Sequence, residues 1–468
     1  MDGDASAAMT VLRVERLGPI VERSELTLRP GMLLLLYGRP GTGKSYTMRL
    51  LYAASRIAER LSHYTLEWRI DAEKLVAGLL SASLSEVYAP DADRILSEAR
   101  FELAGDGVVV RWVEGAPSVE LDEERLKRHY SRISSQDDYL RSIEECTLEV
   151  PEEMRAFCEH YNNAVAYVAA VAEALFDAGL SHCFHSVASY VEATPSSMYV
   201  AHGRSLLALL YELAGEKPVT LSELLSAMRS RPPFSALYEP VLLALEREMG
   251  GTSSLMERVH SVDRLLGVFV HALLLGGDVE RRKTRRGSTE LIYRADGTEL
   301  HMLNTSAAIP EVLTLVAAIL HAIRGARDNR GLLFIEEPET QLHPVLQRLA
   351  AWLLLYLAGL GYTVVASTHS SIIAVEALLA RRAARVGCST VSEVAPLGVL
   401  RDGGLACKLR DAVLSARVSI VYFEDGRFRE YGEEPPGGVP GITDVLEEQL
   451  RALEVIGAAE EMLESEQR

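Results

Sequence analysis

The chain has 468 residues, of which 48% are hydrophobic and 24% are charged, and its formal net charge is −18 at pH 7. This composition predicts a globular protein with a large core, and the acidic balance argues against binding nucleic acid over the whole surface while leaving a local basic patch open. The acidic N-terminus lacks the apolar segment of a signal peptide, and the most apolar predicted helix, 346–361, is too short to span a membrane.

The five cysteines, at positions 146, 158, 183, 388 and 407, are scattered and form no C-x-x-C pair. This usage is typical of a reducing compartment and not of a disulfide scaffold. We therefore expect a cytoplasmic protein that is not a disulfide scaffold and has no contact to a membrane. The stretch HCFH, 182–185, lacks a second pair of metal ligands at a useful spacing, so we favour ordinary packing for it.

The chain begins with short β-rich runs at 9–18, 20–30 and 31–38. The last contains MLLLLY, a continuous apolar run that predicts a strand buried on both faces. A helical pattern follows over 46–61, and two more strand-like stretches follow at 63–70 and 100–113, the second with the form of a hairpin.

The pattern is mostly helical from about 120 to 280, with one predicted strand at 196–204 and a continuous helical pattern over 252–277. Strands and helices then alternate: a hairpin at 289–303, a helix at 306–323, a strand at 331–336, a helix at 345–360 and a strand at 362–368. This alternation predicts a parallel α/β sheet. A last hairpin at 418–432 precedes an acidic helix.

The stretch GRPGTGKS, 38–45, fits the pattern G-x-x-x-x-G-K-[ST] between a predicted strand and a predicted helix. Its glycines let backbone N–H groups surround phosphate oxygens, while Lys44 supplies charge to the β- and γ-phosphates and Ser45 supplies a hydroxyl to Mg²⁺. A chance glycine loop is the alternative, and the strand and helix on either side argue against it. We therefore expect ATP and Mg²⁺ at a cradle formed by Gly38, Arg39, Pro40, Gly41, Thr42, Gly43, Lys44 and Ser45.

Two adjacent glutamates end the predicted strand 331–336, where buried carboxylates are costly unless a cation meets them. A P-loop needs a carboxylate on a neighbouring strand to help hold Mg²⁺. We assign Glu336 to the metal, and Glu337 to positioning and deprotonating the water that attacks the γ-phosphate. A solvated acidic loop at the start of a helix is the alternative.

The segments FIEEPETQLHP, 334–344, and YTVVASTHS, 362–370, resemble the ABC-type AAA ATPases of the recombination, structural-maintenance and OLD (overcoming lysogenization defect) class. The resemblance covers roughly 1–60 and 285–380. It implies an α/β P-loop fold of ABC ATPase type, with a mixed sheet core, an antiparallel β lobe and a large helical insertion. It also implies that His369 contacts the γ-phosphate and that Thr340–Pro344 crosses the interface of a homodimer.

The same resemblance implies a signature motif in LNTSAAIPEV, 303–312, where Ser306 would bond the γ-phosphate of ATP bound to the partner chain. The class usually has glycine after this serine, whereas this chain has Ala307, whose methyl group stands where close backbone approach is expected. A plain helix cap is the alternative for Ser306, and a hydrogen-bonded loop residue is the alternative for His369. Gln136, the available Q-loop candidate, fits a surface position better.

We therefore expect four parts: an N-terminal ATPase lobe (1–120), a mainly helical insertion (121–285), a C-terminal ATPase lobe (286–390), and a small hairpin and helix (391–468). The expected function is ATP hydrolysis by a nucleotide-gated homodimer in DNA repair or anti-phage defence, with DNA or a separate effector or nuclease as further partner. The alternative is an ATP-dependent dimerisation switch with little turnover. The basic run 281–286 is either a solvated loop or a contact to a phosphate backbone. No D-x-D motif follows His369, so we expect no intrinsic nuclease.

Overall fold

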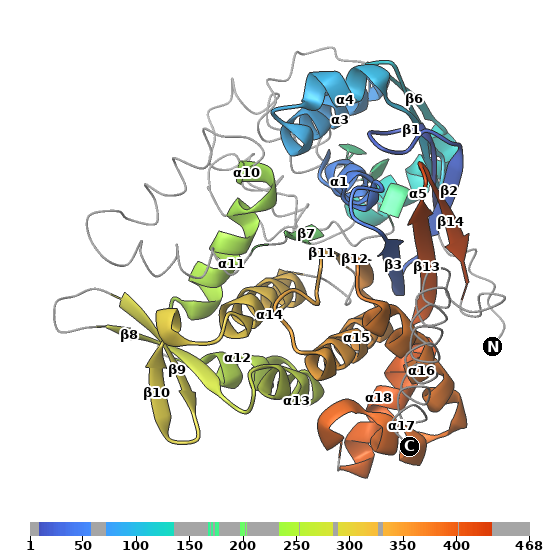
Figure 1. Ribbon diagram of the computed structural model, residues 1–468. Helices are drawn as coiled ribbons and strands as arrows, with labels where there is room; N and C mark the ends of the chain where they lie inside the picture. The colour runs from blue at the N-terminus through green and yellow to red at the C-terminus, as the bar shows by residue number, and fades with distance from the viewer. Residues whose placement is uncertain are drawn as a thin grey trace, which may run out of the picture.

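The computed structural model of the protein describes residues 9–57, 72–134, 167–168, 170–171, 174–176, 197–201, 203, 234–251, 253–283, 289–325, 331–400 and 402–432. A six-stranded central sheet (Figure 1) has the spatial order β14 (Arg427–Tyr431), β13 (Arg417–Glu424), β3 (Met32–Gly38), β12 (Thr363–Thr368), β11 (Leu332–Glu336) and β7 (Ser197–Val200). All neighbouring strands are parallel except β13 and β14. The α/β class expected from the alternating pattern is confirmed.

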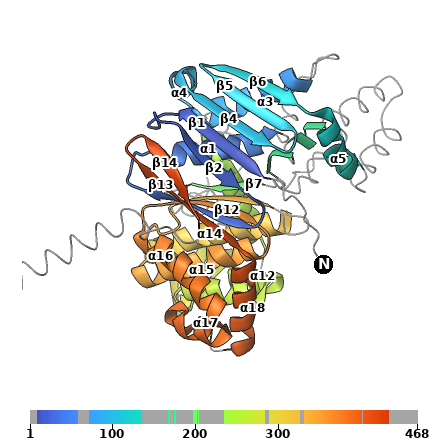
Figure 2. The ribbon, with the colours of Figure 1, turned by 90° about the vertical axis from the view of Figure 1, so that its right-hand side faces the viewer.

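Strand β3 is buried along its whole length, as its apolar run predicts. Because side chains alternate across a strand, Leu33 and Leu35 enter one core while Leu34 and Leu36 enter the other. In Figure 2 the antiparallel β lobe lies above the central sheet, and helices lie below it. The central sheet therefore separates the antiparallel β lobe from the layer of helices. The candidate site described below lies at the ends of its strands.

The helices below the sheet include α14 (Ala308–Gly325), α15 (Pro344–Gly359), α16 (Ser371–Val386), α17 (Cys388–Val394) and α18 (Gly403–Ser415). Helix α15 begins with a proline, and the His343 side chain caps it by accepting from the Val345 N–H. At Gly359, an added Cβ would lie 2.1 Å from the Ala412 carbonyl oxygen, so only glycine permits this approach between α15 and α18.

The antiparallel β lobe has the strand order β2 (Ser24–Leu28), β1 (Thr10–Arg16), β4 (Arg100–Gly105), β5 (Val108–Val113) and β6 (Ala116–Leu121). It packs with α1 (Lys44–Ser55), α3 (Ala72–Tyr88), α4 (Ala92–Glu98) and α5 (Glu123–Ser134). Its outer face alternates in charge: Glu102 accepts from Arg13 at 2.6 Å and from Arg111 at 2.8 Å. These two arginines are already neutralised, so they offer little free positive charge to a nucleic acid. The expected lobe and the hairpin at 100–113 are confirmed.

The described part of the helical region contains α10 (Phe234–Leu237), α11 (Glu239–Met249), α12 (Leu255–Val262) and α13 (Arg264–Leu273). The continuous pattern over 252–277 is corrected, because Asp263 ends α12 and its carboxylate caps α13 by accepting from the Leu266 N–H at 2.8 Å. A β-region conformation at this residue breaks the helical ladder.

A small antiparallel sheet follows, with the order β10 (Thr298–His301), β9 (Thr289–Ala295) and β8 (Asp278–Lys283), and the short helix η2 (Met302–Asn304) comes after it. The basic run does not begin as a loop, because its first three residues lie in β8. Arg281 pairs with Glu246, and Arg282 pairs with Glu280 and Glu299. These carboxylates neutralise Arg281 and Arg282, so the two arginines contribute less to a phosphate contact than the sequence suggests.

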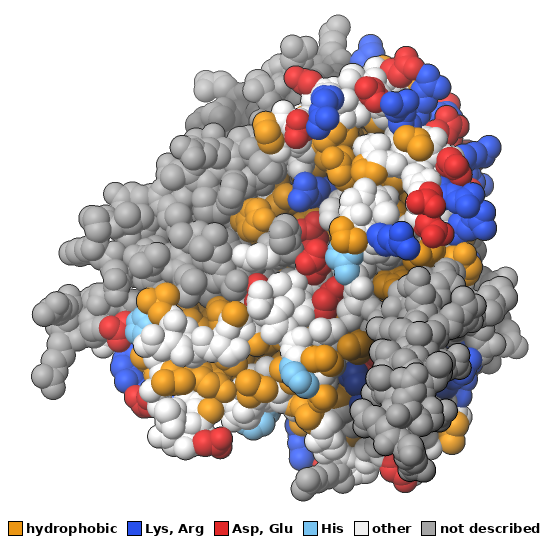
Figure 3. Space-filling model, in the orientation of Figure 1, with side chains coloured by type: hydrophobic (Ala, Val, Ile, Leu, Met, Phe, Trp, Pro, Cys, Tyr) orange, Lys and Arg blue, Asp and Glu red, His pale blue; other side chains and the backbone are white. Residues whose placement is uncertain are grey.

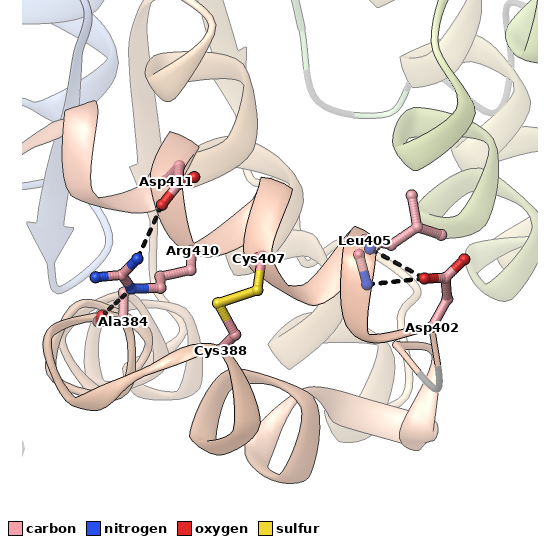
Figure 4. Close-up of a disulfide and its surroundings, with 8 residues drawn as sticks. Ala384, Cys388, Asp402, Leu405, Cys407, Arg410 and Asp411 are labelled. Atoms are coloured by element: carbon pink, nitrogen blue, oxygen red, sulfur yellow. Dashed lines mark hydrogen bonds and ion pairs between the residues drawn. A yellow bond between two sulfur atoms is a disulfide. The ribbon is translucent and has the colours of Figure 1, made fainter.

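The last hairpin is present as β13 and β14, and β13 pairs in parallel with β3. The four-part division of the chain stays a prediction, and this pairing joins residues from its first and last parts in one sheet. The scattered cysteines gave no sign of one feature: Cys388, at the start of α17, is bonded to Cys407 of α18 (Figure 4). The two cysteines meet because helix α17 packs against helix α18. Along the chain, the short helix η3 (Pro396–Gly398) lies between these two helices.

Helix α14 is long and apolar enough to cross a membrane, but 89% of it is buried inside the protein, as expected for a core helix. Several sequence predictions lie outside the described residues: the strand at 63–70, the stretch 182–185, Gln136 and the acidic C-terminal helix.

Candidate functional site

The predicted phosphate cradle connects β3 to α1, as its motif requires. Gly38 has φ 146°, and an added Cβ would lie 2.3 Å from the carbonyl oxygen of Phe423 on β13. Gly43 has φ 107° and precedes α1, where an added Cβ would lie 2.7 Å from the Ile20 side chain. Both positions need glycine, because the conformation and the space exclude a side chain. The loop therefore ends at the N-terminus of a helix, where backbone N–H groups attract anions.

Lys44 is the first residue of α1 and is 5% exposed. Its Nζ donates to the carbonyl oxygens of Gly38 at 2.8 Å and Arg39 at 2.6 Å. Burial lowers the pKa of Lys44 to about 8, against an opposing effect of Glu337 and Glu339. The ammonium thus bonds to carbonyls of its own loop, which phosphate oxygens can replace as acceptors.

The strand that ends in the two glutamates is not adjacent to β3. Strand β12 lies between β3 and β11, which corrects the expectation of neighbouring strands. The correction brings His369 into the site, since it follows β12 directly. Its Nδ1 lies 3.4 Å from Lys44 Nζ and its Nε2 lies 3.6 Å from Glu337 Oε1. One ring nitrogen of His369 therefore faces the ammonium of Lys44 and the other faces the carboxylate of Glu337.

Three residues that are distant in sequence are therefore brought together: Lys44, His369 and Glu337. Figure 3 shows acidic side chains and a histidine gathered near the middle of this face of the protein. Glu337 has φ 44°, an uncommon conformation for a residue with a side chain, and its N–H donates to the Ser367 carbonyl oxygen at 2.8 Å. Such strain is concentrated at functional sites. Thr340 Oγ1 donates to Glu337 Oε2 at 3.3 Å.

Glu336 is 2% exposed and its carboxylate is held from two sides. The hydroxyl of Tyr199, on β7, donates to Glu336 Oε1 at 2.7 Å, and Arg49 Nη2, on α1, lies 3.9 Å from the same oxygen. Burial, and next the neighbouring Glu336 charge, raise the pKa of Tyr199, so the tyrosine stays a donor. Sequence reasoning missed both partners. The position of Arg49, one helical turn after Ser45, was the signal that could have indicated it.

The residues present fit a magnesium ion. Arg49 reaches Glu336 from α1, and Ser45 lies four residues earlier on the same helix, so the serine and the glutamate face the same region. A hydroxyl and a carboxylate are the oxygen donors that magnesium takes beside substrate phosphates.

Ser306 lies exposed two residues before the start of α14 at Ala308. Its Oγ accepts from the Ala308 N–H at 3.4 Å, and its carbonyl oxygen accepts from the Ile309 N–H at 2.9 Å. This is the helix-cap geometry of the alternative interpretation, so the contact with a partner's nucleotide stays a prediction. An exposed side chain at a helix N-terminus is compatible with a helix cap and also with a contact to a nucleotide bound by a partner chain.

The family model of the AAA ATPase domain matches residues 263–374, under a quarter of the chain. The match includes Ser306, Glu336, Glu337 and His369 and does not reach the cradle at 38–45, which depends on its own motif and geometry. None of the curated proteins matches this sequence.

Among solved structures, the chain is similar to head domains of SMC proteins. The SMC head domain from Thermotoga maritima is 10% identical, with a TM-score of 0.35 over 91% of this chain and 99% of that chain. The SmcHead bound to the C-winged helix domain of ScpA is 10% identical, with a TM-score of 0.38 over 90% and 96%. The Smc head domain from Pyrococcus furiosus, bound to the C-terminal domain of ScpA, is 10% identical, with a TM-score of 0.35 over 95% and 98%.

Proposed function

We propose that the protein is an ABC-type ATPase that hydrolyses ATP with Mg²⁺ and acts as a nucleotide-gated homodimer. The observation that carries the proposal is the contact of Lys44 with His369 and of His369 with Glu337, at 3.4 and 3.6 Å. The match of residues 263–374 to the AAA ATPase domain supports it. A cation, a proton donor and a carboxylate at the end of a phosphate cradle are the groups that phosphoryl transfer to water requires.

In the proposed reaction, the oxygen of a water molecule forms a bond to the γ-phosphorus, and the bond from that phosphorus to the oxygen retained by ADP breaks. Glu337 accepts the proton that the water loses. Lys44 and His369 donate to the γ-phosphate oxygens and stabilise the charge that develops there. Magnesium, when bound, neutralises phosphate charge, and Ser45 and Glu336 are the residues that would hold it.

The proposed dimer places Ser306 of one chain against ATP bound to the other, with Thr340–Pro344 at the interface. Ser306 is exposed before α14, and a helix N-terminus favours phosphate. DNA, or a separate effector or nuclease, is the further partner we propose, in DNA repair or anti-phage defence and in the cytoplasm.

A second candidate function is a binding switch that dimerises on ATP with little turnover. Ala307 favours this candidate, since its methyl group stands beside Ser306 where the resembling class has glycine. A weaker trans contact to the γ-phosphate would lower turnover more than it lowers binding.

The test measures ATP binding by calorimetry and ATP turnover with Mg²⁺ in wild type, Lys44→Ala and His369→Ala. We expect turnover in wild type, no ATP binding in Lys44→Ala, and ATP binding without turnover in His369→Ala. His271→Ala, at an exposed position of α13, is the matched control and should behave as wild type. Retained binding in Lys44→Ala would refute the cradle assignment, and ATP binding without turnover in wild type would favour the switch.

A further inference from the structure

The carboxylate of Glu339 lies at the turn that carries His369. Its Oε1 accepts three hydrogen bonds: from Thr368 Oγ1 at 2.8 Å, from the His369 N–H at 2.7 Å and from the Ser370 N–H at 3.1 Å. Hydrogen bonds to an ionised acceptor are stronger than those between neutral groups. The three hydrogen bonds on this one oxygen of Glu339 fix the backbone at His369.

The position of the turn also makes Glu339 suitable for this role. The backbone N–H groups of His369 and Ser370 stand just before α16, where the aligned peptide dipoles favour a negative charge. Within the described part of the chain, the second oxygen of Glu339, Oε2, is buried and accepts no hydrogen bond. Oε1 alone therefore ties residue 339 to the turn.

A second link joins the same two segments. Ser370 Oγ donates to Gln347 Oε1 at 2.6 Å, and Gln347 Nε2 donates to the Leu342 carbonyl oxygen at 3.0 Å. The loop 337–343 and the turn 368–370 are thus held at both ends of the loop, by Glu339 near its start and through Leu342 near its end. Hydrogen bonds therefore join the two segments at two places, although a helix and a strand separate them in the chain.

We propose that Glu339 is a positioning residue, which holds His369 against Lys44 and Glu337 through the three hydrogen bonds on Oε1. This rests on the proposed function, since the geometry it maintains is that of ATP hydrolysis. Glu339 does not touch the groups that react, and it acts through the histidine. The loop that carries Glu339 continues into Thr340–Pro344, the segment proposed at the dimer interface. A partner chain that contacts this segment would therefore influence the position of His369 through Glu339.

Three variants of the full-length protein separate geometry from charge. Glu339→Gln keeps a side-chain oxygen of the same reach and loses the charge near Lys44, whereas Glu339→Asp keeps the charge and is one carbon too short. Glu339→Ala removes both. Glu393→Ala, at an exposed position of α17, is the control. We measure kcat and KM for ATP, and hydrogen exchange of the peptide that contains His369 and Ser370.

We expect kcat to fall about tenfold or more in Glu339→Asp and Glu339→Ala with little change in KM, because a misplaced group costs chemistry and not binding. Glu339→Gln should fall between wild type and Glu339→Ala, because the amide oxygen keeps the three hydrogen bonds but makes them weaker than the carboxylate does. The His369 and Ser370 amides should exchange fastest in the Asp and Ala variants. Thr368→Val, which removes one of the three donors, serves if Glu339→Ala does not fold, and should lower kcat at unchanged KM.

Unchanged kcat in Glu339→Asp overturns the proposal while the proposed function stands. A Gln variant as slow as the Ala variant also overturns it, because the charge near Lys44 would then matter and not the hydrogen bonds. Absence of turnover in wild type contradicts the proposed hydrolysis instead, and hydrogen exchange then decides: unprotected amides in Glu339→Ala support the positioning role, and unchanged exchange refutes it.

Discussion

If Lys44 binds ATP as proposed, ATP binding should depend on pH in a range where most lysines do not titrate. Burial lowers its pKa to about 8, and a bound phosphate restores the charged form. The lysine is charged below its pKa, so its contribution to affinity is complete there. As the pH rises above this pKa, Lys44 loses its proton in the free protein. ATP binding must then be accompanied by the uptake of a proton. Affinity should therefore fall with rising pH.

The magnitude follows from the linkage between proton and ligand. Each pH unit above the pKa of the free protein costs about 1.4 kcal/mol of binding free energy until the pKa of the complex is reached. The ATP dissociation constant should be about twentyfold larger at pH 9.5 than at pH 7.5. A series that starts near pH 7.5 avoids titration of the phosphate itself, whose last pKa is about 6.

The assay is calorimetric titration of ATP into wild type and Lys44→Arg across this range. Arginine remains charged throughout, so the variant should bind ATP with an affinity that does not depend on pH, whatever its absolute value. A flat profile in wild type would contradict the burial of a titrating Lys44. The same slope in both proteins would assign the dependence to another group.

Further predictions concern the partners of Glu336, the signature candidate and the disulfide. Tyr199→Phe should destabilise the protein by about 2 kcal/mol in urea unfolding, because a buried carboxylate loses its donor; an unchanged midpoint would show that the bond contributes nothing. Ser306→Arg should block ATP-dependent dimerisation in light scattering and leave ATP binding intact, and a normal dimer would remove Ser306 from the interface. Cys388→Ser should lower stability by about 3 kcal/mol, the entropic estimate for a bridge across 19 positions, and wild type with reductant should match it.

Local pattern was enough to predict the parts of the site whose geometry is set by neighbours in sequence. The β3–loop–α1 unit follows from an apolar run, glycines and a helical period. The end of β11 with its two glutamates follows in the same way. The structure places Lys44, Glu337 and His369 together, as the resemblance implied, although their roles stay predictions.

Contacts between distant segments could not be predicted, because each is decided by strand order and not by local pattern. The placement of β12 between β3 and β11 determines that His369 stands between Lys44 and Glu337. Tyr199 meets Glu336 only because β7 pairs with β11, 137 positions away in sequence. The disulfide could not be predicted either, because cysteine spacing does not reveal the packing of helix α17 on helix α18.

The central claim is that Glu337 takes the proton of the attacking water in a nucleotide-gated dimer. The most direct measurement is ATP turnover with Mg²⁺ in wild type and Glu337→Gln, with mass followed by light scattering in the same samples. The account predicts turnover in wild type, and in the variant ATP binding, a persistent ATP-bound dimer and no turnover. Turnover at the wild-type rate in Glu337→Gln would contradict it.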